Sequence, residues 1–283
     1  IRQLSAEKAY SRLGNWGRIK KEQKKKGKDI KIVVAGCVAQ LEGEKLLKKF
    51  PYLDLVMGAQ NVFELPNLLK RIETERICAT SKAELKESEF DAIRKKDVNA
   101  WLPIMEGCNN FCSYCVVPYT RGRERSRDIE SIIEEAKKIL SQGFKEITLL
   151  GQNVDSYGKT LENKPNFAAL LKALDEIPGK FRIRFTSSYP TDITDEVIET
   201  VKNSSKICEC FHIPMQSGND RILKEMNRRY NVQEYREIVE KIRNNIKDVA
   251  ITSDFIAGFP GETEENALAT KEFLAKIRSD WSG

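Results

Sequence analysis

The order of apolar and polar residues predicts alternating strands and helices over most of the chain. The clearest helix is expected at residues 128–142, where apolar residues recur at helical spacing, Asp128 is suited to cap the first turn and Gly143 to end the last. Repeated strand–helix units favour a parallel sheet with right-handed crossovers, so this part is predicted to be α/β. Its strands are expected at residues 101–106, 146–150, 181–186, 207–214 and 249–257.

A smaller set of the same elements precedes it and predicts a small α/β domain at residues 1–80. Residues 81–99 are charged and almost without apolar periodicity, which is typical of a linker, and residues 100–283 form the second, larger domain. In the first domain we expect strands at 31–35 and 52–57, and helices at 38–50 and 61–73, the latter capped by Asn61.

The composition is that of a globular protein, with 40% hydrophobic and 32% charged residues. Since no run of about 18 apolar residues occurs and no signal peptide opens the chain, we expect no membrane partner and a cytoplasmic location. Seven cysteines, three of them clustered, argue against a disulfide framework and for a reducing compartment. The net charge of +6 only weakly favours an anionic partner.

Three cysteines stand close together in the chain, at Cys108, Cys112 and Cys115. Thiolates at this C-x3-C-x2-C spacing can turn inward on one loop and bind a soft metal or an iron–sulfur cluster. Three ligands leave one iron of a 4Fe-4S cluster without a protein ligand, and such an open position indicates chemistry. A structural zinc site is the alternative, but zinc needs a fourth ligand and His212 is the sole histidine of the sequence.

The triad, with Tyr114 directly before its last cysteine, resembles the cluster-binding loop of the radical S-adenosylmethionine (SAM) enzymes. Two further runs, Pro118-Tyr-Thr-Arg-Gly-Arg-Glu-Arg-Ser-Arg127 and Gly151-Gln-Asn-Val-Asp-Ser-Tyr-Gly158, resemble the tRNA methylthiotransferases, and among them the type acting on isopentenyl-adenosine at tRNA position 37. The resemblance implies a small flavodoxin-like N-terminal domain followed by a partial TIM-type (β/α) radical SAM barrel. It also implies a fragment, which starts after two of the family's N-terminal cysteines and stops before the sixth barrel strand and a C-terminal RNA-binding domain.

The same resemblance implies the chemistry. A 4Fe-4S cluster on the three cysteines would bind SAM and, after reduction by an external electron donor, cleave it to a 5′-deoxyadenosyl radical. The radical takes hydrogen from C2 of the adenine, and a methylthio group held on a second 4Fe-4S cluster is transferred there, its sulfur coming from an external source. Of the family's three ligands to this auxiliary cluster, the sequence matches one, Cys37.

Further site residues follow from the resemblance and from their place after predicted strands. The residues expected to bind SAM are Tyr114, Gln152, Asn153, Ser187 and Gln216. Arginines that alternate beside the cysteine loop are expected to contact the phosphates of tRNA, at Arg121, Arg123, Arg125 and Arg127.

Two kinds of alternative function stay open. Within enzymes, the methylthio group would go to threonylcarbamoyl-adenosine in tRNA or to a ribosomal protein. Outside enzymes, the chain would be a zinc-stabilised RNA-binding module without catalysis.

Overall fold

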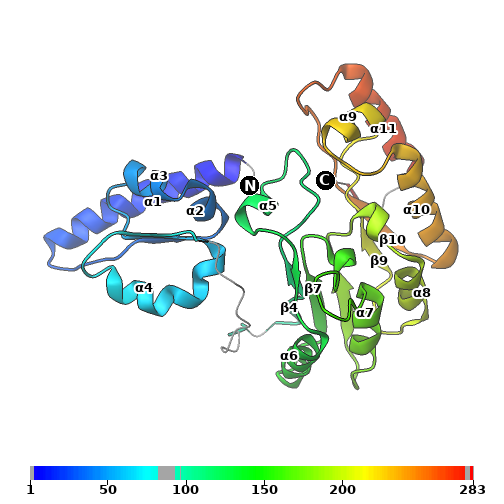
Figure 1. Cartoon of the computed structure of the whole chain (residues 1–283), viewed down its shortest axis with the longest axis horizontal. Coiled ribbons are helices and arrows are strands. Elements are labelled where there is room, and N and C mark those ends of the chain that lie inside the picture. The colour runs from blue at the N-terminus through cyan, green and yellow to red at the C-terminus, as the bar shows by residue number, and fades with distance from the viewer. Residues whose placement is uncertain (1–2, 82–92, 96, 278–280, 283) are drawn as a thin grey trace. The chain divides into compact units, whose positions relative to one another are not determined.

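The computed structural model describes residues 3–81, 93–95, 97–277 and 281–282. The chain divides into two compact units, the first made of Ile1–Ala92 with Cys115–Gly122, and the second of Ile93–Tyr114 with Arg123–Gly283. Most of the predicted linker, residues 82–92 and 96, lies outside the described residues (Figure 1).

The first unit is built on a three-stranded parallel sheet in the order β1-β2-β3, with helices on both faces (Figure 1). Alternate residues of β2 serve the two faces: Val56 packs with Leu46 of α3, whereas Leu55 and Met57 pack with Leu68 of α4. All three β2 residues are buried, as expected for a central parallel strand. The elements are α1 (Gln3–Lys25), β1 (Val33–Ala35), α2 (Cys37–Glu42), α3 (Glu44–Lys49), β2 (Leu55–Met57), η1 (Ala59–Glu64), α4 (Leu65–Arg71), β3 (Ile77–Ala79) and α5 (Val117–Thr120).

Two local predictions in this unit are wrong. The helix expected at 38–50 is split into α2 and α3, because Gly43 adopts φ 47 and ends the first helical run. Asn61 does not cap a helix; it lies inside η1, fully buried, with its side-chain amide 3.2 Å from the Ser81 hydroxyl. Burial near the end of the sheet therefore outweighs the capping preference of this asparagine.

The segment Cys115–Gly122 belongs to the first unit although it comes late in the chain. Its short helix α5 contacts α2, and the Gln60 side chain donates a hydrogen bond of 2.8 Å to the Arg121 carbonyl. The part of the sequence after the third cysteine is thus held by residues more than fifty positions earlier.

The second unit is a partial (β/α) barrel with two three-stranded sheets, β4-β7-β8 and β9-β10-β11, whose sheet pairings are all parallel. A parallel bridge between Ile183 and Ile207 joins the sheets. The strands are β4 (Asn99–Pro103), β5 (Met105–Glu106), β6 (Arg125–Ser126), β7 (Glu146–Leu150), β8 (Arg182–Phe185), β9 (Cys210–His212), β10 (Ala250–Ser253) and β11 (Trp281–Ser282). The helices are α6 (Ile129–Ser141), η2 (Val154–Ser156), α7 (Phe167–Asp175), η3 (Pro190–Asp192), α8 (Asp195–Asn203), α9 (Asp220–Glu225), α10 (Val232–Asn245) and α11 (Glu264–Ile277).

The strands of this unit are two-sided. On β8, Ile183 and Phe185 are buried while Arg182 and Arg184 are exposed. The Phe185 ring meets Phe167 of α7 edge-on at 5.3 Å, so its face of the sheet is the one that the helices cover. The other face is polar, as the 2.9 Å hydrogen bond from Arg184 to Glu146 shows.

Most of the predicted strands of this unit are present with shifted ends. The strand expected at 146–150 has these bounds as β7, and that expected at 207–214 shortens to β9. The prediction that the sixth barrel strand is missing is wrong, because β11 pairs in parallel with β10. Asp128 occupies the N-cap position of α6, but its side chain makes no capping hydrogen bond there.

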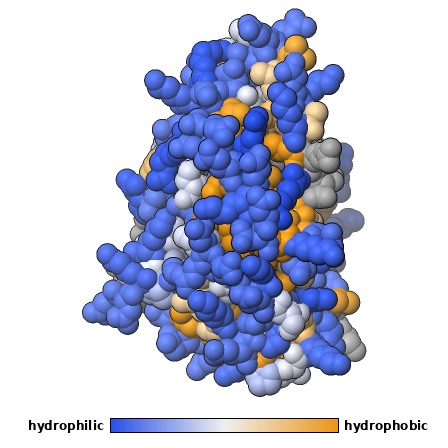
Figure 2. Space-filling model, turned by 90° about the vertical axis from the view of Figure 1, so that its right-hand side faces the viewer, coloured by the Kyte–Doolittle hydropathy of each residue, from blue (hydrophilic) through white to orange (hydrophobic). Residues whose placement is uncertain are grey.

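The helices turn mostly polar side chains to the outer surface, as amphipathic helices do (Figure 2). The face in Figure 2 is predominantly hydrophilic, with a narrow band of hydrophobic residues. Among the described residues, none of the helices has both the length and the hydrophobicity needed to cross a bilayer.

Candidate metal centre

The cysteine loop begins directly after β5, and its residues up to Tyr114, with Cys108 and Cys112, belong to the second unit. Cys108 and Cys112 are both buried, at 8% exposure, and none of the seven cysteines forms a disulfide in the described structure. The loop bends sharply, because Gly107 and Phe111 both have positive φ, at 77 and 49. Positive φ is costly for a bulky residue such as phenylalanine, so the surrounding structure must hold this turn.

The residues that hold the turn come from the end of α9, at residues 225–229, which we call the clamp segment. The Asn227 side chain donates to the carbonyls of Phe111, at 2.9 Å, and Asn110, at 3.3 Å. The backbone N–H and the hydroxyl of Ser113 donate to the carbonyls of Met226 and Glu225, both at 3.0 Å. The contact between the clamp segment and the cysteine loop is visible only in the structure.

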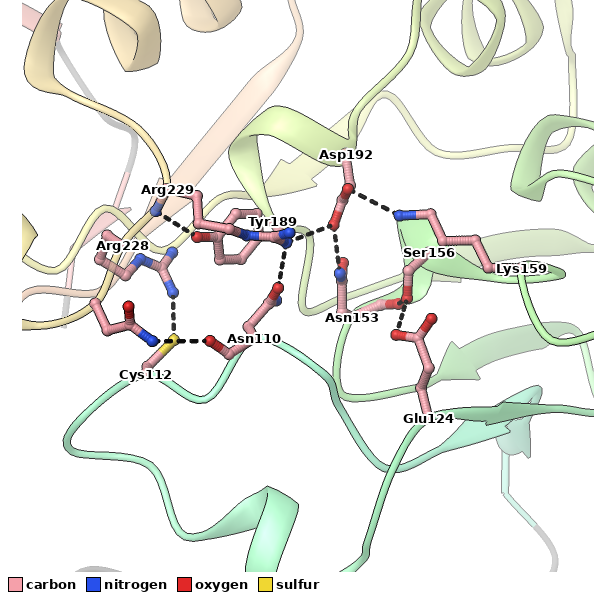
Figure 3. Close-up of polar contacts among 11 residues, drawn as sticks. Asn110, Cys112, Glu124, Asn153, Ser156, Lys159, Tyr189, Asp192, Arg228 and Arg229 are labelled. Carbon is pink, nitrogen blue, oxygen red and sulfur yellow. Dashed lines mark hydrogen bonds and ion pairs between the residues drawn. The ribbon is translucent and has the colours of Figure 1, made fainter.

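Two adjacent arginines of the clamp segment reach different parts of the cysteine loop (Figure 3). Arg228 donates through Nη1 to the Cys112 sulfur at 3.2 Å and to the Tyr114 hydroxyl at 3.4 Å. Arg229 donates instead to the Asn110 side chain, next to the bend. One cation therefore touches a cysteine sulfur, and its neighbour touches the loop beside it.

Asp192 connects Arg229 to the loop after β7 (Figure 3). Its carboxylate accepts hydrogen bonds from Asn153 Nδ2 at 2.6 Å and from Lys159 Nζ at 3.0 Å, and lies 3.9 Å from Arg229 Nη2. The ends of several parallel strands thus converge near the cysteine loop, as expected for a barrel active site.

The residues predicted to bind SAM lie at these strand ends. Tyr114 contacts Arg228, Asn153 is 2% exposed, and the Val154 N–H after it donates to the Ser187 carbonyl at 3.4 Å. Ser187 and Gln216 share a positive φ, at 68 and 77, which turns the chain directly after β8 and beyond β9. Asn153 and Ser187 are thus joined through adjacent backbone, whereas the Gln216 N–H donates at 2.9 Å to the carbonyl of Asp254, directly after β10.

Several buried polar atoms of this region have no hydrogen-bond partner among the described residues. They are mostly oxygen acceptors: Gln152 Oε1, Asn153 Oδ1, both carboxyl oxygens of Asp155, and Ser188 Oγ. Buried polar atoms are normally paired, so these are suited to the donor groups of a polar ligand. A SAM molecule, which carries amino and hydroxyl donors, fits this requirement.

Asp155 and Ser188 are the members of this group that sequence reasoning missed, and Asp155 is the ionisable one. It is 7% exposed, and burial raises the pKa of its carboxyl from the ordinary 3.8 to about 7. The charge of Asp192 adds to the rise, whereas the nearby Ser188 hydroxyl and the Tyr189 backbone oppose it without reaching hydrogen-bond geometry. In the sequence, the position of Asp155 within the Gly151–Gly158 run was the one indication of a role, and this run does not reveal that the carboxyl is buried.

The predicted tRNA-binding arginines differ in their surroundings. The exposed Arg123 places its guanidinium 4.5 Å from the centre of the Phe111 ring. The Arg127 side chain instead stabilises the fold. It donates hydrogen bonds to the Pro103 carbonyl at 2.7 Å, to Glu135 at 2.8 Å and to Ser131 at 2.9 Å. Arg125 lies on β6 opposite Glu106, and Arg121 follows α5 in the first unit.

The remaining predicted ligand, Cys37, begins α2 in the first unit and is half-buried. Gly36 before it adopts φ 103, a turn directly after β1. Cys37 therefore stands at the carboxyl end of a parallel strand. Cys115 is half-buried as well.

Neither metal assignment is visible as a finished ligand set. Among the described residues, no group of three histidine, cysteine or acidic side chains is gathered as a metal site. His212, the fourth ligand that zinc would need, instead pairs with Thr252 at 2.9 Å and lies 3.5 Å from Asp254. By their chemistry, three soft thiols outside any disulfide, two of them buried and the third half-buried, suit the binding of an iron–sulfur cluster.

Two family models match the chain. The model described as Radical SAM superfamily matches residues 102–274, and the one described as Uncharacterized protein family UPF0004 matches residues 1–58. The first of these models covers most of the second unit, and its matched residues include Cys108, Cys112 and Cys115.

Curated relatives are similar along nearly the whole chain. The tRNA-2-methylthio-N(6)-dimethylallyladenosine synthase of Carboxydothermus hydrogenoformans is 45% identical over 99% of this chain and 64% of its own length. The protein of the same name from Clostridium perfringens is 46% identical over 99% of this chain and 63% of its own length. The chain therefore spans slightly less than two thirds of these relatives.

Solved structures share the fold at low sequence identity. The radical S-adenosylmethionine methyltransferase TsrM from Kitasatospora setae has a TM-score of 0.71 at 15% identity, covering 96% of this chain and 58% of that one. The cobalamin-dependent S-adenosylmethionine radical enzyme OxsB has a TM-score of 0.66 at 13% identity, covering 95% and 42%. These likenesses concern the fold alone.

Proposed function

Because this chain belongs to the radical SAM superfamily, we propose that it is part of a methylthiotransferase that adds a methylthio group to C2 of N6-isopentenyl-adenosine at tRNA position 37. The observation that carries the target is the identity of 45% to a synthase of that modification, spread over 99% of the chain. The observation that favours radical chemistry is the buried cysteine loop, clamped beside strand ends with unpartnered acceptors.

In this proposal Cys108, Cys112 and Cys115 hold a 4Fe-4S cluster. When bound, the cluster supplies the electron that cleaves SAM to the radical which takes hydrogen from C2 of the adenine. The chain's own residues bind and orient: Gln152 and Asn153 offer buried acceptors to donor groups of SAM. Burial at the strand ends excludes water from the reactive species.

Cys37 would contribute one ligand to a second, auxiliary 4Fe-4S cluster. Its half-buried place at the carboxyl end of β1, directly after the Gly36 turn, suits a cluster ligand. The sulfur source and the electron donor would be separate molecules. We place the protein in the cytoplasm, where thiols such as these stay reduced.

The target is tested by mass spectrometry of tRNA nucleosides from a strain in which the gene for this chain is deleted. Loss of the methylthio-isopentenyl form alone supports the proposal. Loss of the methylthio-threonylcarbamoyl form, or an unchanged nucleoside profile, redirects it to the other tRNA adenosine or to a ribosomal protein.

Arg123 is the best-placed candidate for a phosphate contact, since it is exposed beside the cysteine loop. We expect Arg123→Ala to weaken tRNA binding and to reduce the slope of log affinity against log salt concentration by about 0.7 to 0.9, the value of one phosphate contact. Binding titrations at several salt concentrations measure this slope. Arg71→Ala is the matched control, because it removes a surface arginine at the end of α4 that pairs with Glu75. An unchanged slope in Arg123→Ala would remove Arg123 from the tRNA surface.

Arg127 should behave differently from Arg123. Because its three hydrogen bonds join β4, α6 and the β6 end, Arg127→Ala is expected to lower the free energy of unfolding by about 1 to 3 kcal/mol without changing the salt slope. Urea denaturation and the same binding titrations separate the two effects. A reduced slope at unchanged stability would restore Arg127 to the tRNA-binding set.

A further inference from the structure

The guanidinium of Arg228 is fixed on every side. Its Nε donates to the Tyr230 hydroxyl at 2.7 Å, and its Nη2 donates to the Pro214 carbonyl at 3.0 Å. The rings of Tyr189 and Tyr230 stack on it, with centroids 4.3 and 4.8 Å from Cζ. This leaves Nη1 pointed at the Cys112 sulfur, 3.2 Å away (Figure 3).

The supports of Arg228 are themselves anchored. The Tyr230 hydroxyl donates to the Met215 carbonyl at 2.8 Å, and the Tyr189 hydroxyl accepts from the Arg229 N–H at 2.9 Å. Burial raises the pKa of Tyr230 above its ordinary value, so this phenol stays neutral. The position of Nη1 is thus determined by a rigid frame and not by the cysteine loop.

The charge of Arg228 has no carboxylate partner among the described residues. Its hydrogen-bond partners are two phenol groups, a carbonyl and the cysteine sulfur. Arg229, by contrast, lies near Asp192, and Asn227 and Ser113 carry the contacts that hold the loop backbone. Arg228 therefore places a positive charge without a carboxylate partner, and an N–H donor, beside the Cys112 thiol.

We propose that Arg228 donates an N–H···S hydrogen bond to the Cys112 ligand of the cluster and thereby raises the cluster's reduction potential. The inference rests on the proposed function, in which Cys112 is a cluster ligand. Hydrogen bonds to ligand sulfurs and nearby positive charge stabilise the reduced, more negative cluster, which is how proteins adjust iron–sulfur potentials. The reduction concerned is the uptake of one electron from an external donor. Arg228 is a positioning and electrostatic residue in this scheme and not a catalytic one.

The test is a redox titration of the reconstituted protein with dithionite, followed by electron paramagnetic resonance and without SAM. The variants are Arg228→Gln, which removes the charge, and Arg228→Lys, which keeps the charge but loses the forked donor. Arg236→Gln is the control, because Arg236 also stacks on a ring, that of Phe273 at 5.6 Å, in the same unit. Iron and sulfide content is measured on every sample.

If Arg228→Gln retains its cluster, we expect the ratio of reduced to oxidised cluster at a fixed solution potential to fall about tenfold. For a one-electron couple this corresponds to a decrease of about 59 mV in the cluster's reduction potential. Arg228→Lys should fall between this variant and the wild type, and Arg236→Gln should match the wild type. An unchanged potential in a fully loaded Arg228→Gln protein would overturn the inference. So would loss of the cluster from both Arg228 variants, because Arg228 would then only place the ligand.

The same samples keep the two proposals apart. If the wild type binds zinc, or takes up no iron and sulfide, the proposed function fails before Arg228 is tested. If the wild type holds the cluster and only the predicted shift is missing, the inference about Arg228 fails alone.

Discussion

Cys112→Ala is expected to abolish SAM cleavage, lowering the rate of 5′-deoxyadenosine formation by more than about 100-fold. Residues that merely support metal ligands already cost 10- to 100-fold when they are changed, and this substitution removes a ligand itself. The measurement is anaerobic: the protein is reconstituted with iron and sulfide, given SAM and a strong reductant, and assayed for 5′-deoxyadenosine.

Cys78→Ala is the matched control for this experiment. Cys78 is a half-buried cysteine on β3 whose thiol has a pKa raised by burial, and its sulfur lies 3.7 Å from the Thr80 hydroxyl. It lies outside the triad, so its loss should leave SAM cleavage intact. SAM cleavage that persists in Cys112→Ala would refute the ligand assignment of Cys112.

Metal analysis of the same protein decides between the enzyme and the zinc module. Iron and sulfide near four each per chain, or more, agree with the cluster, whereas about one zinc and no sulfide would favour the structural module. The pairing of His212 with Thr252 gives the zinc alternative no fourth ligand among the contacts of that residue.

The parts of this molecule that were predictable from sequence are those governed by local pattern. β7 has the bounds that its apolar run predicts, and α6 has its buried stripe at Ile132, Ala136 and Ile139. The triad was recognisable because its spacing is itself the chemical signal. Gly43 adopts a positive φ of 47 that ends a helix, and because the apolar pattern does not reveal this conformation, it overestimates the length of the helix.

The rest depended on contacts between distant positions. Asn227 and Arg228 reach Phe111 and Cys112 across more than one hundred residues, and no periodicity encodes such a pairing. The packing of α5 against α2 is of the same kind. The burial of Asp155 also arises from tertiary packing, because a carboxylate in a polar loop ordinarily stays exposed.

This burial leads to the second large effect, on stability. We expect Asp155→Asn to raise the free energy of unfolding at pH 8 by up to roughly 4 kcal/mol, since the pKa of Asp155 is raised by about 3 and each pH unit is 1.36 kcal/mol. Above pH 7 the wild-type carboxyl is charged in both states, and the folded state bears the cost of burying that charge.

The pH dependence has a definite sign. The folded-state pKa, about 7, lies above the ordinary 3.8, so the native state binds the proton first as pH falls. The wild type therefore gains stability between pH 7 and pH 4, and this contribution is fully present below the unfolded pKa and lost as pH rises through 7. The advantage of Asp155→Asn should accordingly disappear near pH 4, where the wild-type carboxyl is protonated as well.

Urea denaturation at pH 5 and pH 8 measures the difference, and Asp192→Asn is the control. Asp192 accepts hydrogen bonds from Asn153 and Lys159, so its neutralisation should destabilise the protein at pH 8 where that of Asp155 stabilises it. Opposite signs for two carboxylates of neighbouring loops would identify burial without a partner as the cause. If Asp155→Asn were instead as destabilising as Asp192→Asn at pH 8, the prediction would be wrong. The folded state would then stabilise the charged form of Asp155, and its carboxyl would not be a buried group without a partner.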